Sequence, residues 1–332
     1  MRDKEDFPYD EAKKLIEEAD FVTILSHLNP DPDAIGTALG IYNLLKELKK
    51  RRVEVVNASR DLPRHLDFLS GFERIKTKME YDSSLVIACD CGSIERLGFE
   101  LKGRQILNID HHRSNDRYGT LNVVLPEYAS SSQVAFELFK KHYDISVNSA
   151  ECFYAALLSD TRYFTTSSVT AQVFEVAKEM VEIGVDPAKV AYHFTQRRSL
   201  ASFRILQRAL KSLKLYSDAR IAVLYVTKED IAETGATVPD MDGIVDYARS
   251  LTTVEVAVFV MEMKNSIRVS LRSKGIDVNA IAADFGGGGH KVAAGVTFEA
   301  GNLQEIIDTI IGKLQNAIKL KDTGLKNGKK ET

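Results

Sequence analysis

Strand-length apolar runs alternate with helical patterns along the first half of the chain. Such runs lie at Phe21–Leu25, Arg52–Val56, Leu85–Cys89 and Gln105–Ile109, with helix-like segments between several of them. Short apolar strands separated by helices indicate a parallel sheet that is covered on both faces. The alternation therefore predicts an α/β domain with a mainly parallel sheet flanked by helices. Polar residues that directly follow these strands should gather at the carboxyl edge of the sheet, where parallel sheets bind ligands.

The rest of the chain divides into a helical stretch, a connector and a second α/β region. The pattern is helical from Ser130 to Gly184, and Asp186-Pro187 then opens a further helix with a polar middle, which is typical of a connector between domains. Strand and helix patterns resume after it and predict a smaller α/β domain. We predict a first domain over 1–186, a connector helix over 187–213, a second domain over 214–320 and a flexible basic tail over 321–332.

Length and charge limit the classes of function. A chain of 332 residues is long enough for two domains, and its net charge of −3 lacks the positive field of proteins that bind long nucleic acid. Any nucleic-acid substrate is therefore predicted to be short. No apolar run reaches the roughly 20 residues that span a bilayer, and the charged start differs from a signal peptide. With only three cysteines, these features predict a cytoplasmic protein with no membrane contact and no disulfide framework.

Acidic and histidine side chains follow the predicted elements at four places. The clusters are His27-x3-Asp31-x-Asp33, Asp90, Asp110-His111-His112 and Asp160. Carboxylates and imidazoles are suitable ligands for Mn²⁺ and related ions, whereas a structural zinc site would need a spaced cysteine set. Each cluster alone has an ordinary explanation, because Asp33 or Asp160 could simply cap a helix. Together at one sheet edge they would repel one another without a cation, so the set predicts metal.

Five segments in a fixed order carry most of these residues. They read SHLNPDPDAIG, VIACDCGS, NIDHHRSN, LLSDTRYF and, late in the chain, FGGGGHKVAAG. Over nearly the whole chain they resemble the DHH phosphoesterase family with its DHHA1 domain. The resemblance is closest to stand-alone members that act as oligoribonucleases (nanoRNases), as phosphatases of 3'-phosphoadenosine 5'-phosphate, or as phosphodiesterases of dinucleotides. It implies a metal-binding DHH domain followed by a substrate-binding DHHA1 domain, and it leaves open a homodimer.

The resemblance also implies two Mn²⁺ ions, with Mg²⁺ or Co²⁺ as substitutes. The ligands implied for one ion are His27, Asp31 and Asp90, and those implied for the other are Asp33, Asp90, His111 and Asp160. Asp90 would then bridge the two ions and be essential for catalysis, with water as the nucleophile. His112 is implied to meet the phosphate and to stabilise or protonate the departing oxygen.

Glycines and arginines in the second domain are the candidates for substrate binding. The run from Gly286 to Gly289 could be a flexible connector or a stretch of backbone close to an anion. The family motif favours the second interpretation and implies contacts from Gly287, Gly288, Gly289 and His290. In SIRVSLRS the strand pleat puts Arg268, Ser270 and Arg272 on one face. That face is either a solvated edge or, as the resemblance favours, a basic cradle for a terminal phosphate and base.

The first motif departs from the family pattern at two positions. Pro32 stands where the family usually has glycine, and Thr37 replaces a common serine. Proline fixes φ near about −65°, so the geometry of the loop that presents Asp31 and Asp33 stays open.

These features predict a two-metal phosphodiesterase that releases mononucleotides from short oligoribonucleotides and linear dinucleotides such as pApA, with cyclic di-AMP as a further candidate. The first alternative is a phosphatase of 3'-phosphoadenosine 5'-phosphate. A processive exonuclease would need more domains and a more basic groove, and a family pyrophosphatase would lack the GGGGH segment. A non-catalytic nucleotide-binding module would be expected to have lost a ligand, and none is missing.

Overall fold

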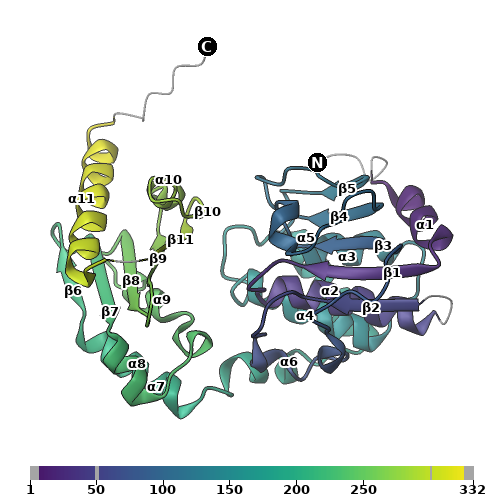
Figure 1. Cartoon of the computed structure of the whole chain (residues 1–332), viewed down its shortest axis with the longest axis horizontal. Helices are drawn as coiled ribbons and strands as arrows, with labels where there is room; N and C mark the ends of the chain where they lie inside the picture. The colour runs from purple at the N-terminus through teal and green to yellow at the C-terminus, as the bar shows by residue number, and fades with distance from the viewer. Residues whose placement is uncertain (1–6, 49–51, 300, 325–332) are drawn as a thin grey trace. The chain divides into compact units, whose positions relative to one another are not determined.

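The chain forms two compact units that divide between Arg197 and Arg198 (Figure 1). The computed structural model describes residues 7–48, 52–299 and 301–324. The division falls inside the segment that was predicted as one connector helix. The structure has two helices there, α6 (Pro187–Thr195) and α7 (Leu200–Lys211), so the prediction of a single helix is wrong. The break follows from capping, because Ser199 accepts a hydrogen bond from the Ser202 amide and starts a new helix.

The first unit is built on a five-stranded parallel sheet with the strand order β2-β1-β3-β4-β5. Its strands are β1 (Phe21–Ser26), β2 (Arg52–Val56), β3 (Leu85–Cys89), β4 (Ile106–Asp110) and β5 (Leu121–Val124). Every neighbouring pair is parallel, so the predicted sheet is confirmed. The strand β5 was not predicted, because it has four residues and only two of them are buried.

Helices cover one face of this sheet, and shorter segments cover the other. The helices of the unit are α1 (Tyr9–Glu18), α2 (Pro32–Glu47), α3 (Ser131–Phe139), α4 (Val147–Asp160), α5 (Ala171–Ile183) and α6. Val22 and Ile87 lie in the core below the helices, whereas Val86 and Ala88 face a second cluster with Leu97. Leu97 belongs to the 3₁₀ turn η4 (Ile94–Leu97); the turns η2 (Arg64–Leu66) and η3 (Phe72–Arg74) lie earlier in the chain. Both faces of the sheet are therefore buried.

The helices α2 and α4 approach each other most closely at two glycines. A Cβ atom on Gly36 would lie 2.6 Å from the Cys152 carbonyl oxygen, and one on Gly40 would lie 2.4 Å from the Phe153 ring. Neither position has room for a methyl group without movement of a helix. This contact fixes the position of α2, which has Asp31 at its N-cap and Asp33 in its first turn.

The direction of chain progression through the sheet reverses between β1 and β3. From β1 the chain passes through α2 to β2 on one side, and it then returns to β3 on the other side of β1. Parallel sheets bind ligands at such a switch point, outside the carboxyl ends of the two strands. The topology thus marks the ends of β1 and β3 as the place for a site.

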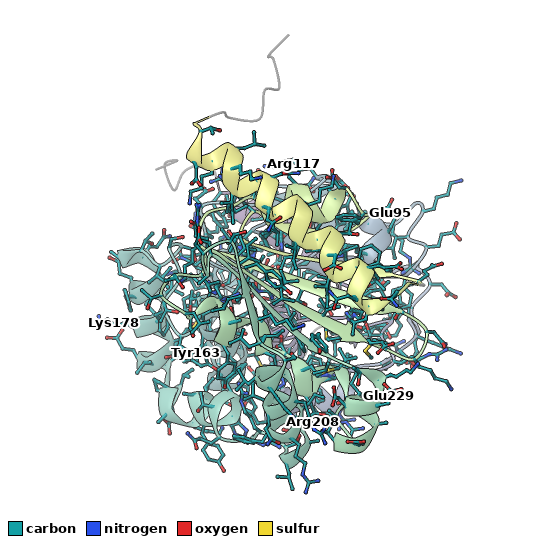
Figure 2. All side chains as sticks on the ribbon, turned by 90° about the vertical axis from the view of Figure 1, so that its left-hand side faces the viewer. Glu95, Arg117, Tyr163, Lys178, Arg208 and Glu229 are labelled. Atoms are coloured by element: carbon teal, nitrogen blue, oxygen red, sulfur yellow. The ribbon has the colours of Figure 1, made fainter. Side chains whose placement is uncertain are left out.

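The second unit contains a six-stranded mixed sheet with the order β10-β11-β9-β8-β7-β6. The strands are β6 (Lys214–Tyr216), β7 (Ile221–Val226), β8 (Val256–Glu262), β9 (Ile267–Ser273), β10 (Gly288–His290) and β11 (Ala293–Phe298). The helical segments after α7 are α8 (Lys228–Thr234), η5 (Val238–Met241), α9 (Ile244–Arg249), α10 (Val278–Ala283) and α11 (Leu303–Asp322). Figure 2 shows α11 crossing one face of the sheet, where Ile310 and Leu314 are buried. Ala209 of α7 and Ala248 of α9 are buried on the other face.

The glycine run is partly in a strand, and the last helix is longer than predicted. Gly288 and Gly289 belong to β10, which pairs antiparallel with β11, so the run is not a flexible connector. The AAG sequence at the end of this motif is the start of β11. The helix α11 continues to Asp322 and takes in the first residues of the predicted tail, while 325–332 lie outside the described residues. Among the helices that the structure describes, none has the length and apolar character to cross a bilayer.

The contact at Gly36 can be tested by adding one methyl group. We expect Gly36→Ala to destabilise the protein by about 1–3 kcal/mol, because the new Cβ would meet the Cys152 carbonyl. Gly312→Ala in α11 is the matched control, since nothing lies within 4 Å of its Cβ position, and it should stabilise by about 0.5–1 kcal/mol. Thermal and urea unfolding followed by circular dichroism would measure both. Equal stability of Gly36→Ala and the parent protein would contradict the close contact.

Candidate metal centre

Acidic and histidine side chains meet at the carboxyl ends of β1, β3 and β4. His27 follows β1, Asp90 follows β3, and Asp110 ends β4 and leads into His111 and His112. Two helices complete the group, because α2 begins beside Asp31 and Asp33 and α4 ends at Asp160. This is the edge and the switch point that the parallel topology favours for a site.

The structure brings the six predicted ligands together in two groups. Their ligand atoms lie within 4.8 Å of one another in each of two groups, one of His27, Asp31 and Asp90 and one of Asp33, His111 and Asp160. A third group of the same kind joins Asp90 and His111 to His112. Asp90 reaches both: its Oδ2 lies 3.6 Å from His27 Nε2 and its Oδ1 lies 3.8 Å from His111 Nε2. The Asp90 carboxylate therefore lies within reach of both groups of candidate ligands. The assignment of each side chain as a ligand stays a prediction.

The spacing of these atoms fits metal binding better than direct hydrogen bonding. His27 Nε2 lies 3.9 Å from Asp31 Oδ2, and His111 Nε2 lies 3.5 Å from Asp160 Oδ2 and 3.9 Å from Asp33 Oδ2. Hydrogen bonds between such atoms would be about 2.7–3.2 Å long. Two ligands that bind one ion at roughly 2.0–2.2 Å lie about 3–4 Å apart. Nitrogen and carboxylate oxygen donors at this spacing suit a divalent ion.

The carboxylates at this edge carry more negative charge than their protein neighbours compensate. Burial and the charges of Asp90, Asp160 and Asp31 raise the pKa of Asp33 well above its usual range, and burial is the main cause that raises the pKa of Asp160 to about 7. Asp90 behaves differently: burial alone would raise its pKa, but the surrounding histidines lower it below the usual range. A bound cation would compensate the charge that remains on the buried acids.

The first turn of α3 holds two of the candidate ligands in place. The amides of Ser131 and Ser132 donate to the two carboxylate oxygens of Asp33 at 2.7 and 3.1 Å. The Ser131 hydroxyl lies 2.8 Å from Asp90 Oδ1 and 3.4 Å from Asp110 Oδ1. Its single proton is therefore best placed to bond to Asp90. The serines Ser130–Ser132 carry no acidic or imidazole group, so their residue type alone did not indicate this role.

Asp110 positions His112, a role that was not predicted from the sequence. It is fully buried, and its Oδ1 lies 2.7 Å from His112 Nδ1 and accepts from the amides of His111 and His112. Asn115 donates to its other oxygen at 2.5 Å. Burial lowers the pKa of His112, but the hydrogen bond to Asp110 and nearby negative charges outweigh it and raise that pKa to about 9. The adjacency of Asp110 to two histidines was a signal that could have identified this role.

The start of α2 shows which aspartate caps the helix and how Pro32 fits there. Asp31, and not Asp33, is the N-cap of the helix: its side chain accepts from the Ala34 amide at 3.0 Å. Pro32 occupies the first helical position, where its fixed φ suits the helix and its missing amide hydrogen costs nothing. Thr37 donates to Asp33 Oδ1 at 3.2 Å, so it acts on the site through a candidate ligand.

Backbone strain gathers around the candidate ligands. Asp90 has φ 54°, and Asn29, two residues after His27, also has φ 54°. Three successive residues after α4, Arg162 to Phe164, have φ between 46° and 62°. Left-handed backbone is costly for residues other than glycine and is concentrated at functional sites. Several of the left-handed residues thus lie where the sheet edge presents its acids, whereas Ser217, Asp218 and Ala219 of the second unit lie elsewhere.

The second unit holds the predicted substrate residues, although not all in one place. The side chains of Arg268, Ser270 and Arg272 share the partly exposed face of β9, as the pleat predicted. A hollow of about 380 Å³ in this unit is lined by Arg268, Ser270 and Gly287, with Gly295 and Thr297 beside them. Arg272, Gly288, Gly289 and His290 do not line it.

Two glycines of the run have a structural reason that the sequence could not reveal. A Cβ on Gly287 would lie 2.3 Å from the Gly295 carbonyl oxygen, and one on Gly289 would lie 2.4 Å from the Ala293 carbonyl oxygen. The hairpin of β10 and β11 therefore needs glycine at both positions whether or not a ligand binds there.

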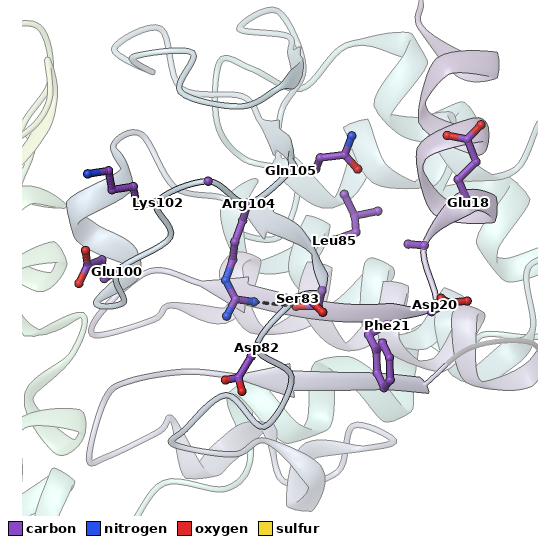
Figure 3. Close-up of a pocket in the computed structure, with 13 residues that line it drawn as sticks. Glu18, Asp20, Phe21, Asp82, Ser83, Leu85, Glu100, Lys102, Arg104 and Gln105 are labelled. Atoms are coloured by element: carbon purple, nitrogen blue, oxygen red, sulfur yellow. Dashed lines mark hydrogen bonds between the residues drawn. The ribbon is translucent and has the colours of Figure 1, made fainter.

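A second hollow lies at the opposite, amino-terminal edge of the first sheet (Figure 3). It measures about 640 Å³ and is lined by residues that precede β1, β3 and β4. In Figure 3 Glu100 lies near Lys102 and Asp82 lies near Arg104, while Glu18 and Asp20 line the other side of the hollow. Arg104 already donates to the Tyr81 carbonyl and to Ser84. We assign no function to this hollow.

Comparison with known proteins matches both units. The family model described as the DHH family, N-terminal domain, matches residues 21–157, and the DHHA1 domain model matches residues 204–316. A Thermus thermophilus protein named bifunctional oligoribonuclease and PAP phosphatase NrnA is 30% identical over 87% of this chain and 88% of its own. The Bacillus subtilis protein of that name is 26% identical over 84% of this chain and 89% of its own.

One solved structure is similar along almost its entire length. An exopolyphosphatase-related protein from Bacteroides fragilis superposes with a TM-score of 0.85 at 27% identity, and the match covers 96% of this chain and 97% of that one.

The contact between Ser131 and Asp90 can be tested through metal affinity. We expect Ser131→Ala to weaken Mn²⁺ binding by roughly 10-fold, because loss of a hydrogen bond that orients a ligand typically costs this much. Ser132→Ala is the matched control, since its hydroxyl is equally buried but contacts Ser130 at 2.7 Å and no carboxylate. Calorimetric titration of metal-free protein would measure both. Equal losses in the two variants would show that Ser131 has no specific role.

Proposed function

Because the chain belongs to the DHH phosphoesterase family with a C-terminal DHHA1 domain, we propose that it is a manganese-dependent phosphodiesterase that hydrolyses short oligoribonucleotides and linear dinucleotides such as pApA to mononucleotides. The observation that carries the proposal is the pair of ligand groups at the switch point of the parallel sheet, with the Asp90 carboxylate near a histidine of each group. The two curated relatives are named as oligoribonucleases, which supports the substrate class.

Two divalent ions, when bound, would lower the pKa of a water molecule and stabilise negative charge on phosphate oxygens. One ion would be held by His27, Asp31 and Asp90, and the other by Asp33, Asp90, His111 and Asp160. Because the Asp110 carboxylate accepts from His112 Nδ1, the proton on that nitrogen is fixed and the ring orientation is set. His112 Nε2 is then the atom that would meet the phosphate or donate a proton to the departing oxygen.

The second unit supports a preference for short substrates. Small-molecule sites have volumes of roughly 300–1,000 Å³, and the hollow beside Arg268 is about 380 Å³. The Arg268 fork suits a phosphate group, while Met261 and Val296 offer apolar surface for a base. The net charge of −3 also provides little attraction for a long polyanion.

A phosphatase activity on 3'-phosphoadenosine 5'-phosphate is the second candidate. Both curated relatives carry PAP phosphatase in their names, and the same metal centre could serve a phosphate monoester. A purely nucleotide-binding role has less support, because all six candidate ligand positions carry side chains that can bind metal.

The experiment that tests the function measures product release from a substrate panel with Mn²⁺ present or chelated. The panel contains pApA, longer RNAs, cyclic di-AMP, 3'-phosphoadenosine 5'-phosphate and pyrophosphate. We expect metal-dependent release of mononucleotides mainly from the short linear species, and Asp90→Asn should abolish it because Asp90 belongs to both ion positions. Cleavage of pyrophosphate alone, or full activity after chelation, would contradict the proposal.

The cradle in the second unit can be tested by comparing two arginines of β9. We expect Arg268→Ala to raise KM for pApA by about 10-fold or more, since Arg268 lines the hollow and a charge-assisted phosphate contact would be lost. Arg272→Ala, on the same face but outside the hollow, should have the smaller effect. Steady-state kinetics and Mn²⁺ affinity would be measured for both, and Mn²⁺ affinity should not change. A larger effect of Arg272→Ala would move the cradle away from the hollow.

A further inference from the structure

Arg96 is fixed next to the loop that carries His27. It belongs to the 3₁₀ turn η4, and its carbonyl oxygen accepts from the Leu28 amide at 2.7 Å. Gly98 ends the turn with φ 75°, and a Cβ there would lie 2.9 Å from Ala58 Cβ and 3.1 Å from Leu28 Cδ2. The turn therefore has little freedom to move away from the metal centre.

The guanidinium of Arg96 lies at the edge of the His27 ring. Its Nη2 is 3.3 Å from His27 Nδ1, and the same Nδ1 is 2.8 Å from the Leu28 carbonyl oxygen. A carbonyl oxygen only accepts, so Nδ1 carries the proton and cannot also accept from Arg96. The ring thus turns Nε2 toward Asp31 and Asp90, while Arg96 contributes a positive charge beside it.

Arg96 has no acidic partner among the residues that the structure describes. No carboxylate in that part of the chain lies within ion-pair distance of its guanidinium, and its side chain is exposed. Two arginines of the first unit are engaged elsewhere: Arg104 donates to the Tyr81 carbonyl and to Ser84, and Arg197 pairs with Asp67. An exposed cation beside a group of acids, yet paired with none of them, is available to an anionic ligand.

The charge balance of the centre indicates why a cation at this position would favour phosphate binding. The four carboxylates Asp31, Asp33, Asp90 and Asp160 would formally cancel the charge of two divalent ions. A loaded centre of this composition has no net positive charge with which to attract a phosphate. An arginine at its rim restores that attraction, and its planar fork matches two phosphate oxygens.

We propose that Arg96 is a substrate-binding residue that contacts phosphate oxygens on the His27 side of the metal centre. The ligand class is a phosphate monoester or diester. The inference rests on the proposed function, since it takes the metal centre as the place where phosphate binds. It places a residue that recognises phosphate in the first unit itself, beside the candidate ligand His27.

The test uses the full-length protein and inorganic phosphate as the probe. Calorimetry would measure Mn²⁺ affinity first and then the affinity of the Mn²⁺-loaded protein for phosphate. We expect Arg96→Ala to weaken phosphate binding by about 10- to 100-fold, the size expected for a lost hydrogen bond to a charged group. Mn²⁺ affinity should stay within about twofold. Arg96→Lys should keep part of the phosphate affinity, because it retains the charge and loses the fork.

Lys102→Ala is the matched control, because it removes one exposed positive charge at the opposite edge of the sheet (Figure 3). It should leave phosphate affinity unchanged. Two results would overturn the proposal: unchanged phosphate binding in Arg96→Ala, or a loss of Mn²⁺ affinity as large as the loss of phosphate affinity, which would mean that Arg96 acts through His27. A parent protein that binds Mn²⁺ and phosphate but hydrolyses none of the substrate panel would contradict the proposed function without affecting the assignment of Arg96.

Discussion

Negative charge buried at one edge of a parallel sheet is the constraint on which the first unit depends. Asp33, Asp90 and Asp110 are 2%, 1% and 0% exposed, and buried carboxylates are costly unless donors or cations surround them. The neighbouring elements supply those donors. The first turn of α3 donates to Asp33 and Asp90, and the amides after β4 donate to Asp110. What these donors leave uncompensated is the charge that a pair of ions would balance.

The sequence predicted the elements that carry the site because their signals are local. The apolar runs of β1, β3 and β4 are continuous, and the acids follow them directly, so the parallel arrangement was enough to bring His27, Asp90 and His111 together. The contribution of Ser131 could not be predicted in this way. Its role depends on where α3 begins after a strand, β5, that is too short and too exposed to have an apolar signature. The break between α6 and α7 was missed because a polar capping sequence resembles the solvated middle of one helix.

In the second unit too, features of a single strand could be predicted from the sequence, and features that depend on neighbouring strands could not. Alternation along β9 was sufficient to place Arg268, Ser270 and Arg272 on one face, because the pleat is a property of the strand alone. Which of them borders a hollow depends on the neighbouring strands, where Gly295 lies opposite Ser270 and Thr297 opposite Arg268. The glycine run was ambiguous for a similar reason: the demand for glycine at 287 and 289 comes from β11, which the run itself does not encode.

The glycine contact between α2 and α4 also bears on how such a centre can change over evolutionary time. Because Gly36 and Gly40 leave no room for a Cβ atom against α4, the tilt of α2 cannot change without a movement of α4. Asp33 lies within this helix, whereas Asp31 is its N-cap and is followed by a proline at the first helical position. A change in the size or coordination number of the ion would therefore be accommodated by changes in the loop from Leu28 to Asp31. The helix would keep its half of the centre constant while the loop diversifies.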